Sequence, residues 1–168
     1  MRSNGLPVAI GATAISLVLI VLIAAAALAL GTCGTSDNID YTPLVIVAAN
    51  GTTAHLQVEI AETPQQLETG LSNRDELPLD TGMLFVIKQR GPGFWMKDTH
   101  VALSVAFIGE CGQIVDIQDM QPLSLDIHST DQPYSFGLEV AQGWFANNGI
   151  TVGDIVSLPK DLRPASCD

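Results

Sequence analysis

Residues 82–99 read GMLFVIKQRGPGFWMKDT and contain the densest apolar and aromatic clusters of the chain. Met83 to Ile87 is an apolar run, which is typical of a buried strand. Gly91-Pro92-Gly93 then interrupts the pattern, because glycine and proline favour turns. Phe94-Trp95-Met96 follows at once. We therefore predict a central hairpin in this stretch, with the rest of the domain packed around it.

A second hairpin and a helix are predicted before this stretch. Thr53 to Ala61 alternates apolar and polar residues with period two, and Leu44 to Ala49 alternates weakly. Asn50-Gly51 between them is typical of a type I′ turn. Residues Thr63 to Gln66 then predict the start of a short helix, because they combine a threonine cap, a proline in the first turn and a capping-box glutamine. Gly70 is the expected helix end.

The second half of the chain predicts mostly strands. Val101–Ile108 is a near-continuous apolar run, and Gln113–Met120 alternates in part. Further strands are expected at Tyr134–Val140 and Ile155–Leu158, with a turn or short helix at Gln142–Asn148. Seven or eight short strands with one or two short helices indicate a mainly β (α+β) fold, which we expect to be a compact, barrel-like single domain.

The composition divides the chain into four parts. We predict a signal or anchor segment at 1–33, a tether at 34–43, a β-rich domain at 44–160 and a C-terminal tail at 161–168. The chain has 7 basic and 18 acidic side chains and a formal net charge of −11. An acidic surface repels phosphate backbones, so we expect no nucleic-acid partner. We also expect a monomer without a cofactor.

The N-terminal segment predicts a domain outside the cytoplasm. Val8 to Leu30 carries no charge and is long enough to cross the apolar core of a bilayer. It suits a cleaved signal peptide, a retained membrane anchor, or the signal of a lipoprotein. The third interpretation rests on Leu30-Gly31-Thr32-Cys33, which resembles a lipobox with Cys33 as the lipidated residue, although Thr32 departs from the usual small residue. All three place the domain on the cell surface or in the periplasm, and we expect the N-terminal segment to tether it to the membrane.

Three cysteines occur, at positions 33, 111 and 167. If Cys33 is lipidated, an even pair remains in an oxidising compartment. A bridge between Cys111 and Cys167 would join the C-terminal tail to the predicted turn at residues 109–112. The alternative is two free thiols.

An ordered set of short motifs resembles a known family, domain-of-unknown-function family 192. The resemblance covers about Leu44 to Leu158, nearly the whole predicted domain. Its motifs are Val58-Glu59-Ile60-Ala61, Gly70-Leu71 with Arg74, Gly82-Met83-Leu84-Phe85, Phe94-Trp95-Met96-Lys97, Leu138-Glu139-Val140 with Gly143, and Gly149-Ile150 with Gly153-Asp154. The resemblance implies a compact, mainly β fold and no established activity.

The chain departs from the family pattern at three places. Asp98-Thr99 stands where Asn-Thr is usual, and Glu110-Cys111-Gly112 replaces an acidic turn. Ser104 follows Leu103 where the family usually has an aspartate. If that carboxylate works in relatives, this chain has lost it unless Asp98 substitutes.

A binding or accessory module is the function that the sequence favours. We predict that Arg74, Trp95, Met96 and Asp98 bind a ligand, a small molecule or a protein partner, in a groove that Phe94 and Trp144 also line. The alternative places both tryptophans in the core and pairs Arg74 with Asp98 or Glu139.

Two other functions remain open. An enzyme of unknown class could use a cleft near Arg74, Trp95 and Asp98, but no nucleophile motif, zinc spacing or phosphate loop is present, so any catalytic residue stays unassigned. A copper-binding protein could use soft ligands, yet these residues show no tight spacing and we assign no metal ligand. The residues considered were Met83, Met96, Met120, His100 and His128.

Overall fold

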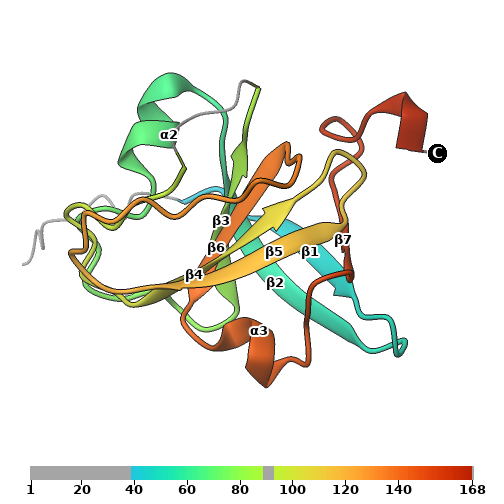
Figure 1. The fold of residues 1–168 in the computed structure, drawn as a ribbon, viewed down its shortest axis with the longest axis horizontal. Helices are drawn as coiled ribbons and strands as arrows, with labels where there is room; N and C mark the ends of the chain where they lie inside the picture. Colours follow the sequence, from blue (N-terminus) through green and yellow to red (C-terminus); the bar gives the residue numbers. More distant parts are fainter. Residues whose placement is uncertain (1–38, 89–92, 168) are drawn as a thin grey trace, which may run out of the picture. The chain divides into compact units, whose positions relative to one another are not determined.

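The computed structural model describes residues 39–88 and 93–167, which form one curled β-sheet with two short α-helices (Figure 1). This confirms the predicted mainly β, barrel-like fold. The predicted Cys33 lipidation site, the Val8–Leu30 run and the Gly91-Pro92 turn lie outside the described residues. Within the described part, no helix has the length and apolarity needed to cross a bilayer. The strands are β1 (Thr42–Val47), β2 (Thr53–Ala61), β3 (Thr81–Val86), β4 (Leu103–Ile108), β5 (Ile114–Met120), β6 (Phe136–Ala141) and β7 (Ile155–Ser157).

The seven strands have the spatial order β5-β4-β6-β3-β2-β1-β7. All neighbouring strands are antiparallel except β2 and β3, which run parallel and are joined by α2 (Pro64–Thr69). The two edge strands meet at one end, where Gln113 forms a bridge with Ile155. There the Ile114 N–H donates to the Asp154 carbonyl at 2.9 Å. The sheet is therefore a half-barrel whose edges join at this end, which we call the closed end.

The predicted central hairpin at residues 82–99 is wrong. Strand β3 pairs with β2 on one side and with β6 on the other, so neither of its edges is free. Phe94 instead pairs with His128, and each backbone N–H donates to the other residue's carbonyl at 2.8 Å. The two apolar segments of this stretch, around Phe85 and around Phe94, still pack together. The rings of Phe85 and Phe94 meet edge to face, with their centroids 5.2 Å apart.

Predictions that rest on neighbouring residues are more accurate than the predicted central hairpin. The predicted capping box at the start of α2 is present, and the helix ends at Gly70. The β1–β2 hairpin also forms, but its turn is not type I′, because only Gly51 in this loop has a positive φ, at 85°. The Gly51 N–H donates to the Ala48 carbonyl at 2.9 Å, and the Ala48 N–H donates to the Thr52 carbonyl at 2.8 Å. This is a three-residue loop with glycine in the left-handed position.

Both faces of the sheet carry a buried apolar cluster. All six residues of β4 are buried, which confirms the predicted buried strand and moves its start to Leu103. Because side chains alternate along a strand, Ala106 and Ile108 enter one cluster while Val105 and Phe107 enter the other. We call these the first core and the second core. Strand β1 and helix α3 (Trp144–Asn147) contribute to the first core, and the residues after α2 and around Phe94 cover the second.

A disulfide and a carboxylate stabilise the closed end. Cys111 and Cys167 are bonded, with their Cα atoms 5.3 Å apart, which confirms the predicted pairing. Asp154 is 3% exposed and accepts hydrogen bonds from the backbone N–H groups of Ala49 at 2.8 Å and Thr151 at 2.7 Å. These bonds lower the pKa of the Asp154 carboxyl, and the bond from Thr151 has the largest effect. The residue before β7 is thereby joined to the loop after β1.

Candidate functional site

An open cleft of about 710 Å³ lies over the second core. Its first wall is the chain from Glu62 to Ser72, which includes α2. Its second wall is the end of β3 and the residues that follow, from Phe85 to Lys88. Gly93, Phe94, Trp95 and Thr99 contribute from the next segment, and Ile127 and Tyr134 from the loop before β6. Glu139 of β6 completes the lining, which is therefore largely apolar.

Four aromatic rings stand edge to face in and beneath this cleft. The ring centroids are 5.2 Å apart for Phe85 and Phe94, 5.6 Å for Phe94 and Phe107, and 5.0 Å for Phe107 and Tyr134. Edge-to-face pairs are a favourable arrangement of aromatic rings. Gly137 makes this stack possible, because a Cβ atom at that position would overlap the Phe94 ring. The floor is thus a packed surface held by β6 and the segment around Phe94.

Glu139 is the buried ionisable group of the described cleft lining. It faces the second core between Met83 of β3 and Val105 of β4, its cross-strand neighbours. The residue is only 5% exposed, and burial raises the pKa of its carboxyl to about 8. Among residues 39–88 and 93–167, no hydrogen bond or ion pair reaches this carboxyl. A buried carboxyl without a partner is costly in its charged form, so Glu139 is mainly protonated at neutral pH.

Arg74 lies outside the cleft lining and pairs with Glu59 of β2. Its guanidinium donates to both carboxylate oxygens, with Nη2 2.7 Å from Oε2. This pairing raises the pKa of Arg74, mainly through the hydrogen bond to Glu59. The sequence suggested Asp98 or Glu139 as the salt-bridge partner, and the structure shows Glu59 instead. The charge of Arg74 is therefore balanced by Glu59, whose cross-strand neighbour is Met83 of β3.

The four predicted ligand residues take different places. Trp95 is 43% exposed and lines the mouth of the cleft, where Lys97 Nζ lies 5.4 Å from its ring centroid. Met96 is fully buried in the second core. Asp98 is exposed, has a φ of 56° and lies outside the lining, and its carbonyl accepts from the Asn73 N–H at 2.7 Å. The structure thus brings only Trp95 of the four into the cleft, together with Phe94.

The other predicted groove residue, Trp144, lies in the first core. It is 8% exposed, and its indole N–H donates to Asp80 Oδ1 at 2.9 Å. Ser104, where the family usually has aspartate, also faces away from the cleft. Its hydroxyl donates to Asp119 Oδ1 at 2.6 Å and accepts from the Gly143 N–H at 3.3 Å. Position 104 therefore does not contribute to the cleft lining.

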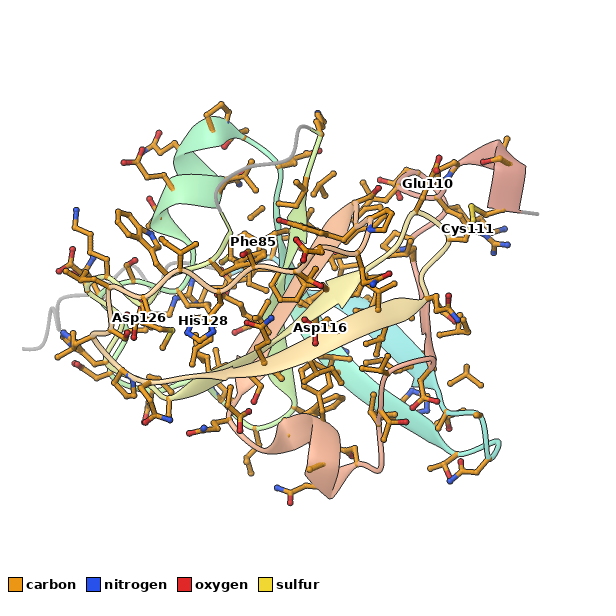
Figure 2. The ribbon with its side chains drawn as sticks, in the orientation of Figure 1. Phe85, Glu110, Cys111, Asp116, Asp126 and His128 are labelled. Carbon is orange, nitrogen blue, oxygen red and sulfur yellow. A yellow bond between two sulfur atoms is a disulfide. The ribbon has the colours of Figure 1, made fainter. Side chains whose placement is uncertain are left out.

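Of the residues considered for copper, the three methionines Met83, Met96 and Met120 all lie in the second core. Met83 and Met120 are buried, while His100 pairs with Asp75 and His128 lies 3.2 Å from Gln118 Oε1. Figure 2 labels His128 and Asp126, which both belong to the loop before β6. In the described ranges, no three His, Cys, Asp or Glu side chains gather closely enough to hold a metal ion.

Sequence reasoning missed Glu139 as a site residue. The signal was present, because β6 reads FGLEVA and glutamate is the one ionisable residue in a strand that is otherwise apolar. A charged residue within a buried strand needs either a partner or a functional explanation. The sequence could not show that a cleft would open above it.

Comparisons with known proteins give a family and two similar folds. Residues 45–158 match the family model DUF192, described as Uncharacterized ACR. A crystal structure of a proposed transcription regulator from Sinorhizobium meliloti 1021 is 32% identical, with a TM-score of 0.67, covering 71% of this chain and 94% of that one. A protein of unknown function from Novosphingobium aromaticivorans DSM 12444 is 26% identical, with a TM-score of 0.65 and coverages of 74% and 89%. A search of curated proteins finds no match.

Proposed function

Because the chain belongs to the DUF192 family, whose description names no activity, we propose its function from the cleft: it is an extracytoplasmic binding module for a small, mostly apolar molecule. The observation that carries this proposal is an apolar cleft of about 710 Å³ whose described lining has a single buried ionisable group, Glu139. Ligand sites have this size and this combination of apolar walls with few polar groups.

Two features support the extracytoplasmic, membrane-tethered part of the proposal. The uncharged run from Val8 to Leu30 suits export or anchoring. The Cys111–Cys167 bond suits an oxidising compartment. The Sinorhizobium protein is described as a proposed transcription regulator. We do not extend that role to this chain, because 18 acidic against 7 basic side chains disfavour nucleic-acid binding.

The binding function is tested with N-phenyl-1-naphthylamine, an apolar probe whose fluorescence rises in dry surroundings. The full chain is placed in lipid nanodiscs, and empty nanodiscs give the background. We expect saturable binding to the wild type. Trp95→Ala removes an exposed ring at the mouth and should weaken binding about tenfold, with less than about 0.5 kcal/mol lost from stability.

Leu79→Ala is the matched control for this variant. Leu79 is 94% exposed and lies outside the cleft lining, so its loss should leave probe binding unchanged. Fluorescence that does not saturate above the nanodisc background would overturn the binding function. Equal losses in Trp95→Ala and Leu79→Ala would show that the probe binds elsewhere and would also overturn it.

A further inference from the structure

The carboxyl of Glu139 lines the cleft and has no bonding partner among the described residues. In the described part of the chain, no side-chain oxygen is both fully buried and without a hydrogen-bond partner. The carboxyl oxygens of Glu139 therefore reach the open space of the cleft. A buried, unpartnered polar side chain directed into a cavity is suited to meet a group on a ligand.

We propose that the cleft selects organic amines, namely small molecules with an apolar body and a protonated amine that pairs with Glu139. This rests on the proposed binding function and names its ligand class. The apolar body would lie against the edge-to-face rings of Phe85, Phe94 and Tyr134. The ammonium group would donate to the Glu139 carboxylate, as charged donors do to carboxylates in their strongest hydrogen bonds.

The charges around the cleft favour a cation over an anion. The wall that contains α2 contributes Glu62 and Glu68, and the wall beyond β3 contributes Lys88. With Glu139 ionised, the described lining carries three acidic groups against one basic group. Lys97, over the Trp95 ring at the mouth, adds one positive charge, and the neighbouring Glu59–Arg74 pair adds no net charge, so an excess of one negative charge remains. An anionic ligand would meet this excess of negative charge, whereas an amine would reduce it.

Binding of an amine changes the protonation of Glu139. In the empty cleft, desolvation keeps the carboxyl neutral at pH 7. An ammonium within bonding distance favours the carboxylate instead, because opposite charges stabilise each other where water is excluded. The protonated carboxyl then loses its proton to solvent while the ligand keeps its own. About one proton should be released for each amine bound at pH 7.

The pH dependence follows from this exchange. Amine affinity should rise as the pH increases from 6 to 8 and then level off. The reason is that a smaller fraction of Glu139 is still protonated at higher pH, so fewer protons have to be displaced on binding. The other ionisable groups of the described lining are Glu62, Glu68, Lys88 and Tyr134, and this lining contains no histidine. Glu139 is therefore the group assigned to a transition in this range.

The experiment compares three compounds of nearly equal shape, which displace the naphthylamine probe from the full chain in nanodiscs. They are 2-phenylethylamine, the neutral 2-phenylethanol and the anionic 3-phenylpropionate. At pH 8 we expect the amine to bind about 10-fold to 100-fold more tightly than the alcohol. The preference should shrink at pH 6. Calorimetry in two buffers with different ionisation enthalpies measures the released proton.

Two glutamate variants make the assignment specific. Glu139→Gln keeps the shape of the side chain but has no charge, so it should lose the preference for the amine while still binding the naphthylamine. Glu110→Gln is the matched control, because Glu110 is exposed and lies beside Cys111 at the closed end (Figure 2). It should keep the amine preference, the pH dependence and the proton release of the wild type.

Several results would overturn the amine proposal and leave the binding function standing. They are equal binding of the alcohol and the amine, preferred binding of the propionate, absence of proton release, and an amine preference that survives in Glu139→Gln. Failure of the naphthylamine to bind would instead remove the binding function itself, so the two proposals fail in different ways.

Discussion

Asp154 and Glu139 are both buried carboxyl groups, but they lie in opposite environments. Asp154, at the closed end, accepts three hydrogen bonds, two from the N–H groups of Ala49 and Thr151 and one from the Thr151 hydroxyl. Glu139, at the base of the cleft, accepts none from the described residues. Their pKa values accordingly move in opposite directions. The comparison separates a carboxylate that stabilises the fold from one that costs stability and is available to a ligand.

The largest effect on stability is expected at the closed end. Replacing both Cys111 and Cys167 by serine opens a covalent loop that spans most of the second half of the domain. Removing this constraint on the unfolded chain should cost about 4 kcal/mol. A urea titration followed by tryptophan fluorescence measures the loss. Probe binding by the folded fraction should stay unchanged, and a matching loss of affinity would show that the two regions are coupled.

Glu139→Gln tests the other side of the comparison and should stabilise the protein. The pKa of Glu139 is about 8 in the folded state against 4.5 for the free group. The contribution of Glu139 to the free energy of unfolding is therefore complete below pH 4.5 and is lost as the pH rises toward 8. Since glutamine stays neutral, the variant should be more stable by up to about 3 kcal/mol at pH 7 and equal to the wild type near pH 4. Urea titrations at both pH values decide this, and a destabilised variant at pH 7 would contradict it.

Asp154→Asn should have the opposite pH signature. The folded-state pKa of Asp154 is lowered, so its contribution is present above the ordinary carboxyl pKa and is lost as the pH falls through the folded value. Weakening its bonds to Ala49 and Thr151 should cost about 2 kcal/mol at pH 7. The difference in the free energy of unfolding between this variant and the wild type should become smaller at acidic pH. A loss that is the same at pH 7 and pH 3 would show that the charge of Asp154 is irrelevant.

Arg74→Ala is expected to have the smallest effect of the four. The pair with Glu59 is partly exposed, with 27% and 16% of the two side chains accessible, so its loss should cost about 1 to 2 kcal/mol. Adding Glu59→Gln should recover part of this, because the uncompensated carboxylate is removed. Probe affinity should not change in either variant. A specific loss of binding in Arg74→Ala would restore the prediction that this residue contacts the ligand.

The sequence predicted what depends on neighbouring residues. The capping box from Thr63 to Gln66 formed because its hydrogen bonds join residues three positions apart. The strand at Thr53–Ala61 formed as predicted, because its alternation is complete within one segment. The disulfide was predicted from the number and positions of the cysteines.

What the sequence could not predict depends on which distant segments meet. The pairing of β3 with β6 and of Phe94 with His128 brings together residues far apart in the chain, and apolar patterns do not specify such partners. The same limit concealed the Glu59 partner of Arg74. The cleft forms where α2, the end of β3, the segment around Phe94 and the loop before β6 meet, so Glu139 could be noticed as unusual but not placed in a site.

The bond between Cys111 and Cys167 turns residues 111–167 into a covalent ring that contains β5, β6, α3 and β7. A protease that cuts once in the exposed loop before β6 opens this ring but releases no fragment. Both carboxyl groups, Glu139 and Asp154, stay attached to the rest of the domain after such a cut. The domain would thereby tolerate a single nick in this half of the chain. The nicked form would keep its full mass on a gel until the disulfide is reduced.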